Sequence, residues 1–123
     1  MKNWIGKWLV GVSILHTAFA VAAYGKVYAS MAASGIVGSG LRSALNSAAS
    51  WFLLFGLLTL ALGLAASALE RSSHPLPKSL GIVLLALAAC GVVLMPVSGF
   101  WLMFPPALVL LWPRRSVAAR ALA

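Results

Sequence analysis

The sequence is almost devoid of negative charge. Glu70 is its single carboxylate among 123 residues, and charged residues make up only 8% of the chain. A soluble domain usually has about a quarter of its residues charged, and these keep its surface in water. Hydrophobic residues make up 63% of this chain, so the material for such a surface is missing. The composition therefore excludes an ordinary water-soluble domain and predicts that the lipid bilayer is the protein's solvent.

Cysteine and clustered metal ligands are also scarce. Cys90 is alone, so no disulfide can form within the chain. His16, His74, Cys90 and the four methionines show no paired spacing, and we predict no bound metal. The nine Lys and Arg residues form no dense patch, so the net charge of +8 predicts no nucleic-acid partner. No phosphate-binding loop, nucleophile elbow or pair of acid–base carboxylates is present.

Four apolar runs predict four membrane-spanning helices. The predicted spans are residues 4–23, 51–69, 79–95 and 100–112 of a single transmembrane domain, 1–123. The first run also resembles a secretory signal, but its length of about 20 residues is enough to cross about 30 Å of hydrocarbon. The predicted fold class is an all-α integral membrane four-helix bundle.

Two segments depart from this simple pattern. Residues 24–50 are rich in glycine and serine and are too polar to span, although residues 26–33 fit a short interfacial helix with Val27, Met31 and Tyr28 against lipid. Pro105 and Pro106 lie inside the last run, and proline removes a backbone donor from a helix. Helix four is therefore expected to be kinked at the proline pair, or to have an irregular entry before a helix that starts there.

The basic residues predict the orientation. With four spans, one side of the membrane holds seven of them and the other holds Lys26 and Arg42. The seven are Lys2, Lys7, Arg71, Lys78, Arg114, Arg115 and Arg120. Basic residues are retained in the cytoplasm, so we predict an inner-membrane protein with both termini cytoplasmic. The five tryptophans agree, since all fall near the predicted membrane surfaces, where indole rings prefer to lie.

His16 is the sharpest candidate for chemistry because it lies past the middle of the first span, where a polar ring is costly. Helical spacing places Ser13, Thr17 and Tyr24 on its face, which must look into the bundle. A neutral imidazole there could exchange a proton or orient the polar group of a ligand. In the structural alternative, the ring bridges two helices by a hydrogen bond to a hydroxyl or a backbone carbonyl.

Aromatic residues near the last turn could wall a pocket for an apolar molecule. The predicted ligand-binding residues are His16, Ser13, Thr17, Tyr24, Trp101 and Phe104. The alternative for Trp101 is a simple aromatic anchor at the membrane surface. Haem could use His16 as an axial ligand, but the second histidine would have to come from another subunit because His74 lies in a loop. We therefore predict no cofactor.

Small residues recur at helical spacing and predict close helix packing. In the second span they are Gly56, Thr59, Gly63 and Ser67, and elsewhere Gly6, Gly11, Gly81 and Ala88. Glu70 follows the second span directly and is interpreted as a solvated partner of Arg71 in the loop.

Several short motifs extend over nearly the whole chain. They are Trp4-x-Gly6 with Gly11 and His16, Trp51-Phe52-x-x-Phe55-Gly56, Glu70-Arg71 with Pro75-Leu76-Pro77, and Met95-Pro96-x-Ser98-Gly99-Phe100-Trp101 with Pro105-Pro106. On these motifs, of which the last is the most specific, the chain resembles a family of small four-helix bacterial membrane proteins that carries only a domain-of-unknown-function label. The resemblance implies a four-span membrane protein without an assigned activity.

Three functions remain open. The first is binding or carrying a small lipophilic molecule in the bundle near His16. The second is a membrane enzyme, an isomerase or oxidoreductase on a lipid-like substrate, although His16 has no carboxylate partner and we expect no enzyme. The third is a non-catalytic accessory or oligomer-forming membrane protein. A homo-oligomer is expected in any case, because so short a bundle encloses little volume.

Overall fold

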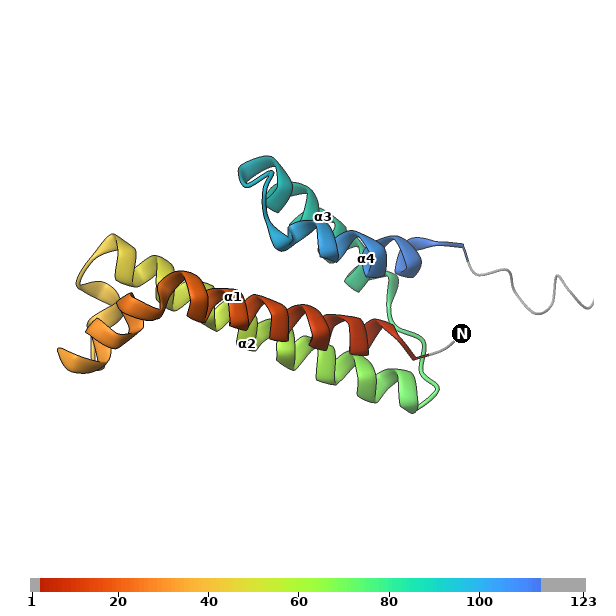
Figure 1. Ribbon diagram of the computed structural model, residues 1–123. Coiled ribbons are helices and arrows are strands. Elements are labelled where there is room, and N and C mark those ends of the chain that lie inside the picture. The colour runs from red at the N-terminus through yellow and green to blue at the C-terminus, as the bar shows by residue number, and fades with distance from the viewer. Residues whose placement is uncertain (1–2, 114–123) are drawn as a thin grey trace, which may run out of the picture. The chain divides into compact units, whose positions relative to one another are not determined.

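The computed structural model describes residues 3–113, and this part of the chain is helical without any strand. Its elements are α1 (Ile5–Ala33), η1 (Ser39–Leu41), α2 (Ala44–Arg71), α3 (Lys78–Leu94), η2 (Gly99–Met103) and α4 (Phe104–Leu111), where η denotes a 3-10 helix (Figure 1). The chain divides after Pro75 into two compact units, each a helical hairpin. Lys2, Arg114, Arg115 and Arg120, which enter the predicted charge count, lie outside the described residues.

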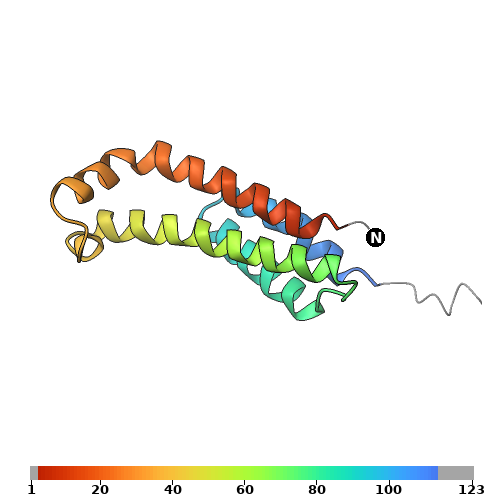
Figure 2. The ribbon, with the colours of Figure 1, turned by 90° about the horizontal axis from the view of Figure 1, so that it is seen from below.

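The first hairpin pairs α1 with α2 along their lengths (Figure 2). The buried residues of α1 are Ile5, Gly6, Leu9, Ser13 and Ala20. Those of α2 are Ala49, Gly56, Thr59, Gly63 and Ala66. In both helices the buried positions recur at helical spacing, so one stripe of each faces the other. Most of these side chains are small, which lets the two backbones approach closely.

The close approach is visible at the glycines. A Cβ atom on Gly63 would lie 2.8 Å from the Val10 amide nitrogen, and one on Gly6 would collide with Ser67. The predicted packing role of the small stripe on α2 is therefore confirmed. The prediction for Gly11 is wrong, since a Cβ there would meet nothing within 4 Å.

Both helices of this hairpin run past the predicted spans. α1 continues to Ala33, and α2 begins at Ala44, so the expected interfacial helix over 26–33 is the end of α1. The Ser43 hydroxyl caps α2 by accepting from the Asn46 amide at 3.1 Å. Hydropathy falls where hydrocarbon is expected to end, whereas an alanine-rich backbone can stay helical beyond that point.

The second hairpin pairs α3 with η2 and α4. Ala88 is fully buried, and a Cβ on Gly81 would lie 2.8 Å from the Leu110 Cβ, which confirms the predicted packing at both positions. Helix four has the second of its two expected forms, because 3-10 helix η2 precedes α4 and both prolines lie in the first turn of α4. The first amides of a helix have no intrahelical partner, so proline is tolerated there.

Candidate functional site

His16 bridges the two helices of the first hairpin. Its Nε2 lies 2.8 Å from the Phe52 carbonyl oxygen, and its ring stacks on the Phe52 ring with centroids 4.1 Å apart and planes 16° apart. The Phe55 ring is tilted against it at 5.3 Å. A carbonyl can only accept, so Nε2 carries the hydrogen and, in the neutral ring, Nδ1 is the acceptor. This geometry is the structural alternative stated for His16.

Ser13 and Thr17 lie beside His16 against the same stretch of α2. The Ser13 hydroxyl is buried and donates to the Gly56 carbonyl at 3.0 Å. A Cβ on Gly56 would come within 2.8 Å of Thr17 Oγ1 and 3.1 Å of His16 Cδ2. The absence of a side chain at Gly56 therefore makes room for His16 and Thr17, while Ser13 bonds to its carbonyl.

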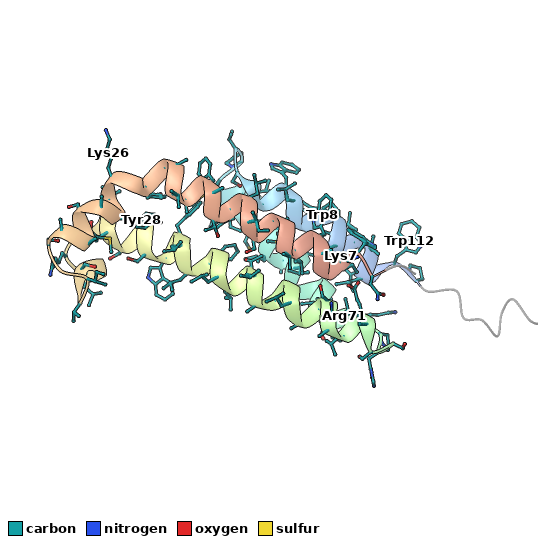
Figure 3. All side chains as sticks on the ribbon, turned by 60° about the horizontal axis from the view of Figure 1, so that its bottom comes forward. Lys7, Trp8, Lys26, Tyr28, Arg71 and Trp112 are labelled. Atoms are coloured by element: carbon teal, nitrogen blue, oxygen red, sulfur yellow. The ribbon has the colours of Figure 1, made fainter. Side chains whose placement is uncertain are left out.

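Tyr24 extends this group toward the loop end of the hairpin. Its ring lies 5.5 Å from the Phe52 ring and 6.3 Å from that of Tyr28. Tyr28 in turn donates its hydroxyl to the Ala49 carbonyl at 2.8 Å, and it lies toward α2 (Figure 3). The expectation that Tyr28 faces lipid is therefore wrong. Its spacing of four from Tyr24 was the signal that both share one helix face.

Four of the predicted site residues thus come together in the first hairpin, and the other two belong to the second. Trp101 and Phe104 pack on one another with ring centroids 5.6 Å apart. The Trp101 indole donates to the Pro96 carbonyl at 2.8 Å, so its polar edge is used within its own turn. A pocket shared by both groups stays a prediction.

Glu70 has a role that sequence reasoning missed. Its Oε1 accepts from the Ile5 amide at 3.2 Å and its Oε2 from the Gly6 amide at 3.1 Å. These amides open α1, where Trp4 at the N-cap supplies no side-chain cap and the first turn has no acidic residue. A carboxylate is favoured there by the free amides and by the helix dipole. The interpretation of Glu70 as a solvated loop residue is therefore wrong.

The described residues offer no clustered metal ligands and no free Nε2 on His16. Among residues 3–113, no three His, Cys, Asp or Glu side chains come close enough to hold a metal ion. The Nε2 atom of His16 carries a hydrogen directed at Phe52, so this nitrogen has no lone pair to offer haem iron while the bridge is formed.

A family profile matches residues 1–117. The chain belongs to the DUF6463 family of unknown function. The resemblance to an uncharacterised family of small four-helix proteins is therefore confirmed. No curated protein and no solved structure matches the chain.

Proposed function

We propose that the protein is a multi-pass inner-membrane protein that acts through helix contacts, as an accessory or oligomer-forming component, rather than through catalysis. The observation that supports this most is the reversed polarity of the first hairpin. Apart from Ile5 and Leu9, its buried residues are Gly, Ala, Ser and Thr, while many large apolar side chains are exposed along both helices. A protein folded in water has the opposite arrangement.

The exterior of α2 illustrates this. Six leucines lie on it, with exposed fractions between 43% and 68%: Leu45, Leu54, Leu57, Leu58, Leu64 and Leu69. On α1, Ile14, Leu15 and Phe19 are exposed to a similar degree. Lipid tails solvate such side chains at no cost, so their exposure supports the membrane location.

Helix length and burial point the same way. Both α1 and α2 are long and apolar enough to cross a membrane, by length and composition. The core helix of a soluble protein would pass that test but would be mostly buried, whereas 28% of the apolar window of α1 and 22% of that of α2 are buried. A signal sequence would pass it too, but α1 packs on a matching partner helix.

The distribution of basic residues supports the predicted orientation of the first hairpin in the membrane. Lys7 and Arg71 lie at one end of it, and Lys26 lies toward the other (Figure 3). With the remaining Lys and Arg residues counted from the sequence, the positive-inside rule puts both termini in the cytoplasm.

The site geometry favours contact over catalysis. An acid–base histidine must reach a substrate proton, and its pKa is usually tuned by a partner group. Here Nε2 of His16 is engaged by a backbone carbonyl, and the single carboxylate of the chain is held by the α1 amides. Both groups therefore act within the hairpin.

Membrane extraction followed by native mass spectrometry tests this proposal. The protein should stay with the membrane after an alkaline wash, and gently extracted protein should appear as a homo-oligomer or with a co-purifying membrane partner. Folded, monodisperse protein in buffer without detergent would contradict the membrane location. A monomer without any partner would contradict the accessory role.

Binding of a small lipophilic molecule near His16 is the second candidate. It is favoured by the rings of Phe52 and Phe55, which lie against a histidine whose Nδ1 is an acceptor, and by the Tyr24 ring beside that of Phe52. A molecule retained by the wild type in native mass spectrometry and lost in His16→Phe would support it. That variant keeps an aromatic ring and removes both nitrogens, so loss of the molecule would follow from the polar contact.

A further inference from the structure

Each arm of the second hairpin is shorter than the hydrocarbon of a bilayer is thick. α3 has 17 residues, which span about 25 Å at 1.5 Å per residue. On the return, the 5 residues of η2 and the 8 of α4 span about 22 Å. The hydrocarbon is about 30 Å thick, whereas α1 with 29 residues and α2 with 28 each reach about 42 Å.

The tip of the second hairpin, residues 93–101, has the chemistry of a lipid-facing surface. No charged residue occurs between Lys78 and Arg114. The most exposed side chains at the tip are all apolar: Val93 at 79%, Leu94 at 78%, Met95 at 58%, Val97 at 101% and Trp101 at 56%. Acyl chains match an uncharged apolar surface, and a chain facing water would place charged or polar side chains there.

The tip of the first hairpin, residues 34–47, also exposes apolar side chains, such as Val37 at 93% and Leu41 at 89%, but it differs in carrying a charge. Arg42 donates to the Ser34 carbonyl at 2.9 Å and to its hydroxyl at 2.8 Å, and its side chain is exposed. Ser47 and Asn46 also donate to backbone carbonyls of this loop. A guanidinium at such a position suits a water-facing loop.

Irregular backbone inside hydrocarbon is tolerated only if its polar groups find partners. At the second tip some of these partners come from the turn itself. The Ser98 hydroxyl donates to the Met95 carbonyl at 2.6 Å and accepts from the Phe100 amide at 3.5 Å, and the Trp101 indole donates to the Pro96 carbonyl. Pro96 adds no backbone donor. These bonds reduce the number of polar groups that the turn would leave without a partner in hydrocarbon.

We propose that α3, η2 and α4 form a re-entrant hairpin: it enters the bilayer from the cytoplasmic side, ends among the acyl chains of the far leaflet, and returns without reaching the outside. The occupant of its apolar tip is lipid. The inference rests on the membrane location proposed above and replaces two of the four predicted crossings. Both termini stay cytoplasmic, because the hairpin starts and ends on one side.

Two valines provide a matched test, since Val37 at 93% and Val97 at 101% are the most exposed large apolar side chains of their respective tips. Each is replaced by cysteine in a Cys90→Ala background and treated with a membrane-impermeant maleimide on intact cells. We expect Val37→Cys to be labelled from outside, and Val97→Cys to react at least about tenfold more slowly until detergent is added, because hydrocarbon excludes the charged reagent. Equal labelling of both from outside would overturn the re-entrant hairpin.

A nitroxide at residue 97 gives a second readout that does not depend on cysteine reactivity. It should collide with oxygen far more often than with a water-soluble nickel chelate, and Val93→Cys should behave alike. Efficient disulfide cross-linking of Val97→Cys between copies, or its labelling from the cytoplasmic side, would overturn the assignment of lipid as occupant. If the wild type is found in the soluble fraction, the membrane location itself has failed; if it is membrane-bound but Val97→Cys is labelled from outside, only the re-entrant hairpin has failed.

Discussion

The two hairpins solve the same packing problem with different side chains. In the first, small residues bring two long helices together, and Ser13, His16 and Tyr28 each donate to a carbonyl of the opposite helix. In the second, glycines receive bulky apolar groups: Gly91 lies under the Phe100 ring and Gly81 under Leu110. In the bilayer location proposed above, neither hairpin would gain from the hydrophobic effect, because lipid tails are as apolar as leucine. Close contact and hydrogen bonds must hold the first, and close contact alone dominates in the second.

The most damaging change should be Gly63→Val in the first hairpin. A Cβ there meets backbone atoms of Val10 and Gly6, which cannot rotate away, so the helices must separate. We expect a loss of about 3 kcal/mol in the free energy of unfolding, measured by thermal or denaturant unfolding in detergent. Gly11→Val, which has open space, is the control for helix propensity, and equal losses in both variants would contradict the close approach.

Glu70→Gln should cause the next largest loss in the free energy of unfolding. Glutamine keeps one oxygen but loses the charge that the first amides of α1 favour, and we expect a loss of about 1–2 kcal/mol. The exposed neighbour Arg71→Gln should change stability by less than about 0.5 kcal/mol. If the two variants unfold together, the carboxylate is not what fixes this end of the hairpin.

Gly91→Ala tests how tightly the second hairpin is packed. The added methyl group would overlap the Phe100 ring, including its Cγ, so the whole half-buried ring must turn away, and we expect a loss of about 1–2 kcal/mol. Gly99→Ala, with nothing nearby, serves as the matched control. A loss larger than that of Gly63→Val would mean that the second hairpin is the more tightly packed of the two.

Ser13→Ala should have the smallest effect. It removes one buried bond to the Gly56 carbonyl, and a hydrogen bond between membrane helices contributes about 0.6 kcal/mol on average. Ser30→Ala, on an exposed position of the same helix, should be neutral. An effect above about 2 kcal/mol would show that Ser13 supports a larger network with His16 and Thr17.

The sequence predicted the small stripe on α2 and the face shared by Ser13, His16 and Thr17, because both follow from helical spacing. It misplaced the end of α1 and the start of α2, since hydropathy reports where hydrocarbon is expected to end. The Ser43 cap could have been predicted, because serine is a preferred N-cap residue and its hydroxyl accepts from the amide three residues later, here that of Asn46. The partners of Glu70 could not be read from spacing, because the bonds join residues 65 and 64 positions apart. For helix four, the proline pair allowed two forms, and only the packing of η2 and α4 decided between them.

The Glu70 bonds have a consequence for how the chain is made. The Ile5 and Gly6 amides of α1 are synthesised long before Glu70, whose carboxylate accepts their hydrogen bonds. During translation these amides must therefore bond to water or to lipid headgroups. They gain their protein partner only when the last turn of α2 has emerged and folded back. These hydrogen bonds can therefore form only once the pair of α1 and α2 is complete. A chain that ends before Glu70 lacks them.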